Sequence, residues 1–173
     1  MAGRNSKQTV RNMVLSLGVS VLAAGVIYLF VPHDDSPPPL KRVDYRVELL
    51  TARRAASYPV AAPEGLPKSW KATSVRFQGD DFDAWHLGFH DPEGQYVAIE
   101  QSAQKPSTFI DDATQGAEET KSTRKIGDQV WRRYEGERYD ALVLEGDGVT
   151  TVVTGSAPLA QLTTMAEALK TAE

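Results

Sequence analysis

The chain has 173 residues, of which 41% are hydrophobic and 24% are charged, and its formal net charge is −4. This composition predicts one folded domain of ordinary size with an appendage, and it excludes wholesale disorder. Cysteine is absent, which excludes a disulfide framework, a thiolate metal site, a cysteine nucleophile and a lipid-modified cysteine. The acidic balance argues against nucleic acid as a partner.

The N-terminal region divides by charge into a basic tail and an apolar segment. Residues 1–13 carry three basic and no acidic side chains, and residues 14–31 contain neither a charged residue nor a proline. As a helix, the apolar segment would span about 27 Å, close to the hydrocarbon thickness of a bilayer. We interpret residues 14–31 as a single-pass signal-anchor helix in the lipid bilayer of the plasma membrane, ended by Pro32. The positive-inside rule then leaves the tail in the cytoplasm and places the rest of the chain outside.

Two further interpretations of this helix stay open. A cleaved signal peptide is the alternative, because Ala23 and Ala24 offer small residues near a cleavage site. Against cleavage, the apolar run continues to residue 31 and is longer than a typical secretory core. Ser16, Ser20 and Ala24 share one helix face, and small residues at that spacing allow close helix contact. A weak homodimer is therefore a hypothesis.

The rest of the chain reads as a stalk followed by one domain. Residues 32–39 are polar and proline-rich, which is typical of a stiff spacer. Residues 40–173 are expected to form an extracytoplasmic α+β domain: a mostly antiparallel sheet packed against a C-terminal helix. Tyr58–Pro67 reads as an extended loop and Thr114–Arg124 as a mobile one. We expect about six strands, at 70–78, 84–90, 95–101, 129–134, 139–145 and 149–154, a further short strand at 43–48, and helices at 49–56, 106–113 (capped by Ser107) and 158–171.

Three stretches together are similar to a known family. They are Tyr58–Pro67 leading to Trp70, the segment Trp85–Phe89, and the segment Gly94–Ser102. With the anchored N-terminus, the chain resembles an actinobacterial family of membrane-anchored proteins known as domain of unknown function 4245. The resemblance covers most of the chain. It implies a membrane-anchored protein, and it brings no activity, ligand or catalytic residue.

Two histidines, a short acidic run and the serines are the candidate metal ligands and nucleophiles of the chain. His86 and His90 lie four residues apart on a predicted strand, so they would be roughly 13 Å apart and could not share one zinc ion. The acidic run at 80–83 matches a calcium loop only in part and reads as a solvated turn. No serine lies in a Gly-x-Ser-x-Gly motif, and Glu100 could pair with Asp140 or Glu145 only if the fold brings them together. We therefore predict no catalytic, metal or cofactor-binding residue and no cofactor.

Aromatic and basic residues leave a binding role open. The three tryptophans, with several tyrosines, read as core residues, although an aromatic groove could bind a peptide or a glycan. The basic residues at 132, 133 and 138 read as a charged sheet edge. We expect a non-catalytic module that binds an envelope protein or glycan. A sensor or regulatory subunit of another membrane protein is the alternative, and an envelope enzyme is the weaker third choice.

Overall fold

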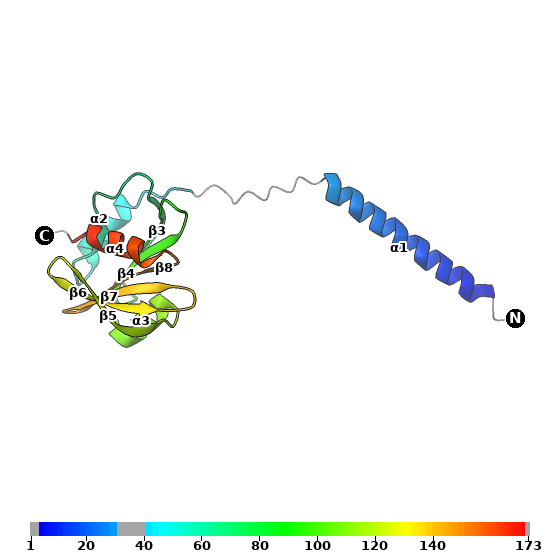
Figure 1. The fold of residues 1–173 in the computed structure, drawn as a ribbon. Coiled ribbons are helices and arrows are strands. Elements are labelled where there is room, and N and C mark those ends of the chain that lie inside the picture. Colours follow the sequence, from blue (N-terminus) through cyan, green and yellow to red (C-terminus); the bar gives the residue numbers. More distant parts are fainter. Residues whose placement is uncertain (1–3, 31–40, 172–173) are drawn as a thin grey trace. The chain divides into compact units, whose positions relative to one another are not determined.

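The computed structural model describes residues 4–30 and 41–171, which belong to two separate units of the chain (Figure 1). The predicted stalk at 32–39 and the predicted helix end at Val31 and Pro32 lie outside the described residues.

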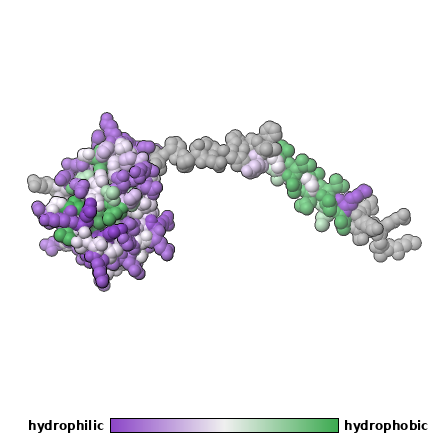
Figure 2. Space-filling model, in the orientation of Figure 1, coloured by the Kyte–Doolittle hydropathy of each residue, from purple (hydrophilic) through white to green (hydrophobic). Residues whose placement is uncertain are grey.

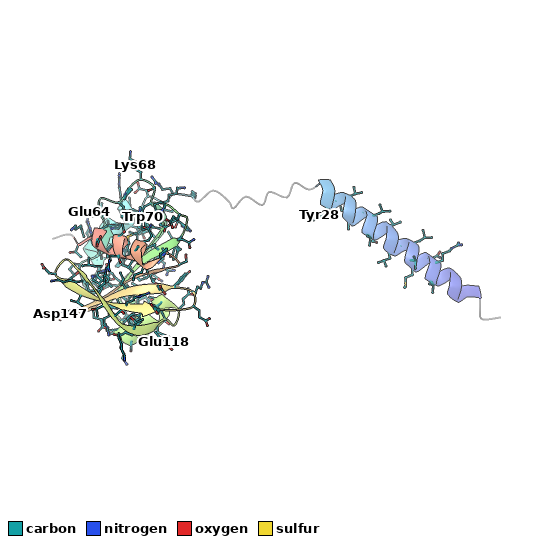
Figure 3. The ribbon with its side chains drawn as sticks, viewed as in Figure 1. Tyr28, Glu64, Lys68, Trp70, Glu118 and Asp147 are labelled. Carbon is teal, nitrogen blue, oxygen red and sulfur yellow. The ribbon has the colours of Figure 1, made fainter. Side chains whose placement is uncertain are left out.

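The N-terminal unit is helix α1, Arg4–Phe30. Its stretch Val10–Tyr28 has a mean hydropathy of 1.8 over 19 residues and is long and apolar enough to cross a membrane. A signal sequence near the N-terminus would share these properties. Figure 2 shows this stretch as a mostly hydrophobic surface, and Tyr28 lies near the C-terminal end of the helix (Figure 3). The helix begins at Arg4, so residues 4–13 of the basic tail belong to the same helix.

A seven-stranded antiparallel sheet forms the centre of the C-terminal domain. Two meanders, β2–β3–β4 and β5–β6–β7–β8, are joined by pairing between β4 and β8. A small second sheet pairs β1 with β9. The elements are α2 (Arg46–Ala55), β1 (Ala61–Pro63), β2 (Lys71–Gln78), β3 (Ala84–His90), β4 (Tyr96–Ser102), α3 (Pro106–Thr114), β5 (Glu118–Ile126), β6 (Gln129–Glu135), β7 (Asp140–Gly146), β8 (Val149–Gly155), α4 (Leu159–Ala168) and β9 (Leu169–Thr171). The predicted α+β architecture is thus confirmed.

The two faces of the large sheet carry different helices, α4 on one side and α3 on the other (Figure 1). The α4 face holds the main core, because α4, α2 and the loop before β2 all pack on it. Its buried apolar side chains include Trp85, Leu87, Ile99, Leu142, Val153, Leu162 and Met165. The burial of each such side chain contributes about 1.5–3 kcal/mol. The helix stripe predicted for α4 is confirmed.

The extended segment before β2 is fixed to the α4 face by buried polar contacts. The indole Nε1 of Trp85 donates to the Ala61 carbonyl (3.0 Å), and the Ala61 N–H donates to Gln101 Oε1 (2.7 Å). The Tyr58 hydroxyl donates to the carbonyls of Asp83 and Gln101. Burial raises the pKa of Tyr58, and the charge of Asp83 adds to that shift. The predicted loop is therefore ordered, and its residues Ala61–Pro63 form β1.

The β3–β4 hairpin matches its prediction because its turn residues are chemically specific. Asp91 Oδ1 accepts hydrogen bonds from the N–H groups of Glu93 (2.9 Å) and Gln95 (2.8 Å). Gly94 adopts φ +83°, a conformation that favours glycine. The strands predicted at 129–134, 139–145 and 149–154 are confirmed as β6, β7 and β8.

Two predictions at the start of the domain and in its middle are wrong. Residues 46–48 lie in α2 rather than in a strand, because Tyr45, Leu49 and Ala52 meet the core at helical spacing. Val47, expected on a strand face, is exposed. Residues 118–124 form edge strand β5 rather than a mobile loop. The alternation is missing there because both faces of this edge strand are largely exposed, and its lysines and arginine are typical of a protected edge.

The ends of two helices also differ from their predictions. Ser107 does not cap α3: the helix begins at Pro106, and the N-cap residue is Lys105, without a side-chain hydrogen bond. Helix α4 ends at Ala168 rather than at residue 171. The following three residues form β9, because the extended segment of β1 offers them a strand partner.

Candidate functional site

Helix α3 covers only part of its sheet face. Phe109 and Ile110 of α3 are buried against Ala141, Val143 and Val152 of β7 and β8. The side chains that β2, β3 and β4 present to the same face are mostly polar and half-buried. An open polar area thus lies beside α3 on the β2–β4 half of the sheet.

A groove with a volume of about 620 Å³ runs between α3 and this polar area. We call it the α3 groove. Its wall combines carboxylates, amides, hydroxyls, one guanidinium and two tyrosines. The lining residues are Arg76, Gln78, Asp81, Ala84, Tyr96, Ala98, Glu100, Ser102, Gln104, Phe109, Asp112, Ala113, Gln115, Tyr139 and Thr154. This polar lining suits a ligand with many hydrogen-bonding groups.

Three side chains from the adjacent strands β2, β3 and β4 form a continuous chain of hydrogen bonds on the polar half of this sheet face. Ser74 Oγ on β2 lies 2.8 Å from His86 Nε2 on β3, and His86 Nδ1 lies 2.6 Å from Glu100 Oε1 on β4. The side chains of His86 and Glu100 are 18% and 20% exposed. We call this hydrogen-bonded chain the relay. The arrangement suits a neutral imidazole that donates from Nδ1 to the Glu100 carboxylate and accepts at Nε2 from the serine hydroxyl.

The relay depends on the register of the strands and on one glycine. A register shift between Ala72 and Ser74 sets Ser74 opposite Gly88, while His86 pairs with Glu100. A Cβ atom at position 88 would lie 2.3 Å from Ser74 Oγ and 3.0 Å from the Tyr96 hydroxyl oxygen. Only glycine therefore leaves room for both oxygens above β3.

Tyr96 stands beside the relay as a neutral hydrogen-bond donor. Burial raises the pKa of Tyr96 to about 12, the charge of Glu100 adds to the rise, and a hydrogen bond with Ser74 opposes it. The phenol consequently keeps its proton at neutral pH. Its ring also lies 6.0 Å from the ring of Tyr139, the second tyrosine of the α3 groove.

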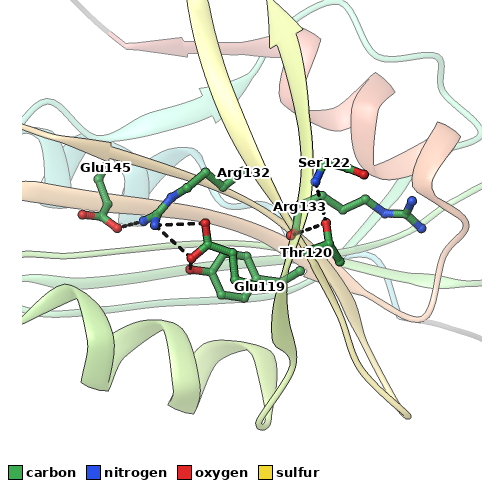
Figure 4. A network of polar contacts seen from close by, with 7 residues as sticks. Glu119, Thr120, Ser122, Arg132, Arg133 and Glu145 are labelled. Atoms are coloured by element: carbon green, nitrogen blue, oxygen red, sulfur yellow. Dashed lines mark hydrogen bonds and ion pairs between the residues drawn. The ribbon is translucent and has the colours of Figure 1, made fainter.

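The opposite end of the same face holds a network of ion pairs (Figure 4). Arg132 pairs with Glu119 and with Glu145, and Glu119 also accepts a hydrogen bond from the Tyr134 hydroxyl (3.2 Å). Arg133, which lies on the α4 face opposite Leu142, pairs with Glu135. The predicted charged edge is wrong for Arg132 and Arg133, because β6 lies between β5 and β7 and both side chains have acidic partners. The guanidinium of Arg138 lies over the ring of Tyr139 instead.

Both histidines lie on strand β3, as predicted, and they have separate partners. His90 Nδ1 lies 3.3 Å from Thr73 Oγ1, and the His90 ring meets Tyr96 edge-on. The part of the chain that the structure describes contains no group of three or more His, Asp or Glu side chains placed to hold a metal ion.

The acidic residues considered from sequence are separated in the structure. Glu100 contacts His86, and Glu145 contacts Arg132, so Glu100 pairs with neither Asp140 nor Glu145. The acidic run lies in a turn, as predicted, but Asp83 does more than face solvent. Its carboxylate accepts hydrogen bonds from the Ser57 N–H (2.9 Å) and hydroxyl (2.6 Å), which lower its pKa.

All three tryptophans are buried, as expected for core residues. Trp131 is buried while Val130 next to it is exposed, so the two side chains lie on opposite faces of β6. Two further hollows border tryptophans: one of about 650 Å³ beside Trp70 and one of about 250 Å³ beside Trp131. Neither contains a line of reactive side chains like the relay.

Sequence reasoning assigned no chemical role to Ser74 and considered Tyr96 only as one of the aromatic residues that could line a groove. Strand alternation places Ser74 and Arg76 on the face opposite to Val75 and Phe77, but it does not show that Ser74 lies beside His86. The cross-strand contacts themselves depend on the register shift in β2, for which the sequence carries no clear sign.

One family model, that of the protein family of unknown function DUF4245, matches residues 5–169. The chain belongs to this family. The match covers nearly the whole chain, including α1, the relay and the α3 groove. No curated protein matches the chain.

Proposed function

We propose that this protein is a single-pass membrane protein whose C-terminal domain binds a cell-envelope glycan in the α3 groove. The observation that carries the proposal is the open polar groove on a face that α3 leaves half uncovered. The polar β2–β4 half of this sheet face and the adjacent side of helix α3 together form a concave site that a hydrated ligand can enter.

The composition of the groove favours a glycan over an apolar peptide segment. Tyr96 and Tyr139 supply flat amphipathic rings, while Asp112, Glu100 and Arg76 supply charged hydrogen-bonding groups. Aromatic rings with a polar tip suit ligands that are apolar on one side and hydroxylated on the other. A peptide or an envelope protein is the competing occupant.

The membrane part of the proposal rests on α1 and on the charge of the tail. The stretch Val10–Tyr28 is apolar enough to span a bilayer, and residues 1–13 are basic without an acidic residue. The positive-inside rule places such a tail in the cytoplasm and the C-terminal domain outside. An uncleaved anchor would keep the groove near the membrane.

The absence of cysteine makes the orientation simple to test. Asp147→Cys, in the exposed β7–β8 turn (Figure 3), and Ser6→Cys, in the tail, each add the only thiol. In intact cells, a membrane-impermeant maleimide should label the Asp147→Cys variant, and it should label Ser6→Cys only after permeabilisation. The opposite pattern would reverse the topology, and release of a shortened Asp147→Cys chain into the medium would show cleavage.

Binding is tested with a matched pair of aspartates on α3. Asp112 lines the groove, whereas its exposed neighbour Asp111 does not. The full chain in detergent should retain solubilised cell-wall glycan fragments, Asp112→Asn and Tyr139→Ala should weaken retention at least about 10-fold, and Asp111→Asn should not. Equal retention by all variants would reject the groove. Copurification with a membrane protein, without glycan, would favour the regulatory-subunit alternative.

A further inference from the structure

The relay connects three side chains of different chemistry across three adjacent strands, which is more than a polar contact between two strands. A hydroxyl, an imidazole and a carboxylate lie in line, and each ring nitrogen of His86 has a different partner, at 2.8 Å and 2.6 Å. In this order the carboxylate orients the imidazole, and the imidazole can remove the hydroxyl proton. This arrangement could not be expected from the sequence, since Ser74 lies in no nucleophile motif.

The surroundings supply the other parts of an acyl-transfer site. The hydroxyl oxygen of Tyr96 and Ser74 Oγ both lie close to the space above Gly88. When Ser74 attacks an ester, the carbonyl oxygen of that ester gains negative charge, and the Tyr96 hydroxyl can donate a hydrogen bond to it. Tyr96 and Glu100 both line the α3 groove. A ligand held in the groove therefore lies next to the relay.

We propose that Ser74 is a nucleophile activated by His86 and oriented through Glu100, and that it cleaves small acyl esters. That the esters are carried by a glycan rests on the proposed binding function. The reactivity of Ser74 does not depend on that function. Ser74 and His86 are the catalytic residues of this proposal, Tyr96 is the oxyanion donor, and Glu100 is a positioning residue.

The reaction balances with water as the only co-reactant. Ser74 Oγ attacks the ester carbonyl carbon while its proton passes to His86 Nε2, and the carbonyl oxygen accepts a hydrogen bond from Tyr96. The C–O bond to the alcohol then breaks, and the imidazolium gives its proton to the leaving oxygen. Water attacks the acyl-serine, His86 takes the proton of that water, and the carboxylic acid leaves as Ser74 is reprotonated.

The first test uses a fluorophosphonate probe on the full chain in detergent, because such probes modify activated serines without needing a glycan. We expect one labelled site, identified by peptide mass as Ser74. Ser74→Ala should lose the label, and His86→Gln should slow labelling at least about 100-fold, the usual contribution of a general base. Ser107→Ala, at an exposed serine of α3, is the control that should label normally.

Folding and positioning are separated from chemistry by two additional measurements. Tryptophan fluorescence in urea reports whether each variant is folded, because all three tryptophans are buried in the C-terminal domain. Glu100→Gln should label slowly and Glu100→Asp should restore part of the rate at a similar urea midpoint, a difference that a purely structural role would not produce. Hydrolysis of p-nitrophenyl acetate should follow the same order of variants.

Two results would overturn the proposal. One is a folded wild-type chain in which Ser74 remains unlabelled, and the other is labelling at Ser74 that folded His86→Gln leaves unchanged. Failure of glycan retention with normal Ser74 labelling would reject only the groove ligand. Normal glycan retention without labelling would reject only the chemistry.

Discussion

The two faces of the large sheet are built from the same strands and have opposite characters. The α4 face is covered by α4, α2 and the loop of β1, and its central side chains, such as Leu142 and Leu162, are fully buried. The α3 face is covered only over β7 and β8, and its β2–β4 half carries the relay and the α3 groove. The comparison indicates that one face supplies most of the stability, which leaves the other free to hold polar groups in fixed positions.

The largest expected effect lies on the α4 face. Leu142→Ala removes a fully buried side chain and should lower the free energy of unfolding by about 3 kcal/mol, through lost burial and the cavity left behind. Urea unfolding of the full chain in detergent, followed by tryptophan fluorescence, measures it. Val130→Ala, at an exposed position of β6, is the control. A loss for Leu142→Ala below about 1 kcal/mol would contradict the division of roles between the faces.

The next effect concerns the buried polar link within the α4 face. Gln101 accepts from the Ala61 N–H and donates to Thr151 Oγ1 (3.0 Å). Gln101→Leu leaves both partners buried without their hydrogen bonds and should cost about 2 kcal/mol. The same urea assay applies, with exposed Gln129→Leu as the control. A Gln101→Leu variant more stable than the wild type would mean that these hydrogen bonds position the segment around Ala61 and do not stabilise the domain.

The sequence predicts the α4 face better than the α3 face, for a physical reason. Strand β3 alternates because its α4 face is apolar and its α3 face is polar, and a similar contrast reveals the stripe of α4. Strands β7 and β8 are instead buried on both faces at their centres and appear in the sequence as apolar runs. Edge strand β5 buries neither face and shows no such contrast. The relay depends on a register shift in β2 and the groove on how far α3 reaches across the sheet, so neither follows from the residues of any single strand.

A smaller effect tests how closely the side chains of the α3 face pack around Gly88 and the relay. Gly88→Ala places a methyl group 2.3 Å from Ser74 Oγ and should cost about 1.5 kcal/mol, within the range for overpacking. The double variant with Ser74→Ala removes that contact and should recover about half of the loss in a double-mutant cycle. Strict additivity of the two changes would show that Ser74 Oγ does not occupy the space above Gly88.

The smallest effect is a pH dependence that belongs to the α3 face alone. The pKa of Tyr96 is about 12 in the folded chain and about 10 when unfolded, so folding is favoured while the phenol keeps its proton. This contribution is complete below pH 10 and is lost as the pH rises through 12. Between pH 9 and pH 11, the wild-type chain should lose about 1 kcal/mol more unfolding free energy than Tyr96→Phe. The comparison between pH 7 and pH 9, where the phenol is protonated in both states, is the control and should show no such difference. Equal losses in the two chains up to pH 11 would show that Tyr96 is open to solvent, and the phenol would then be a poor donor to the relay.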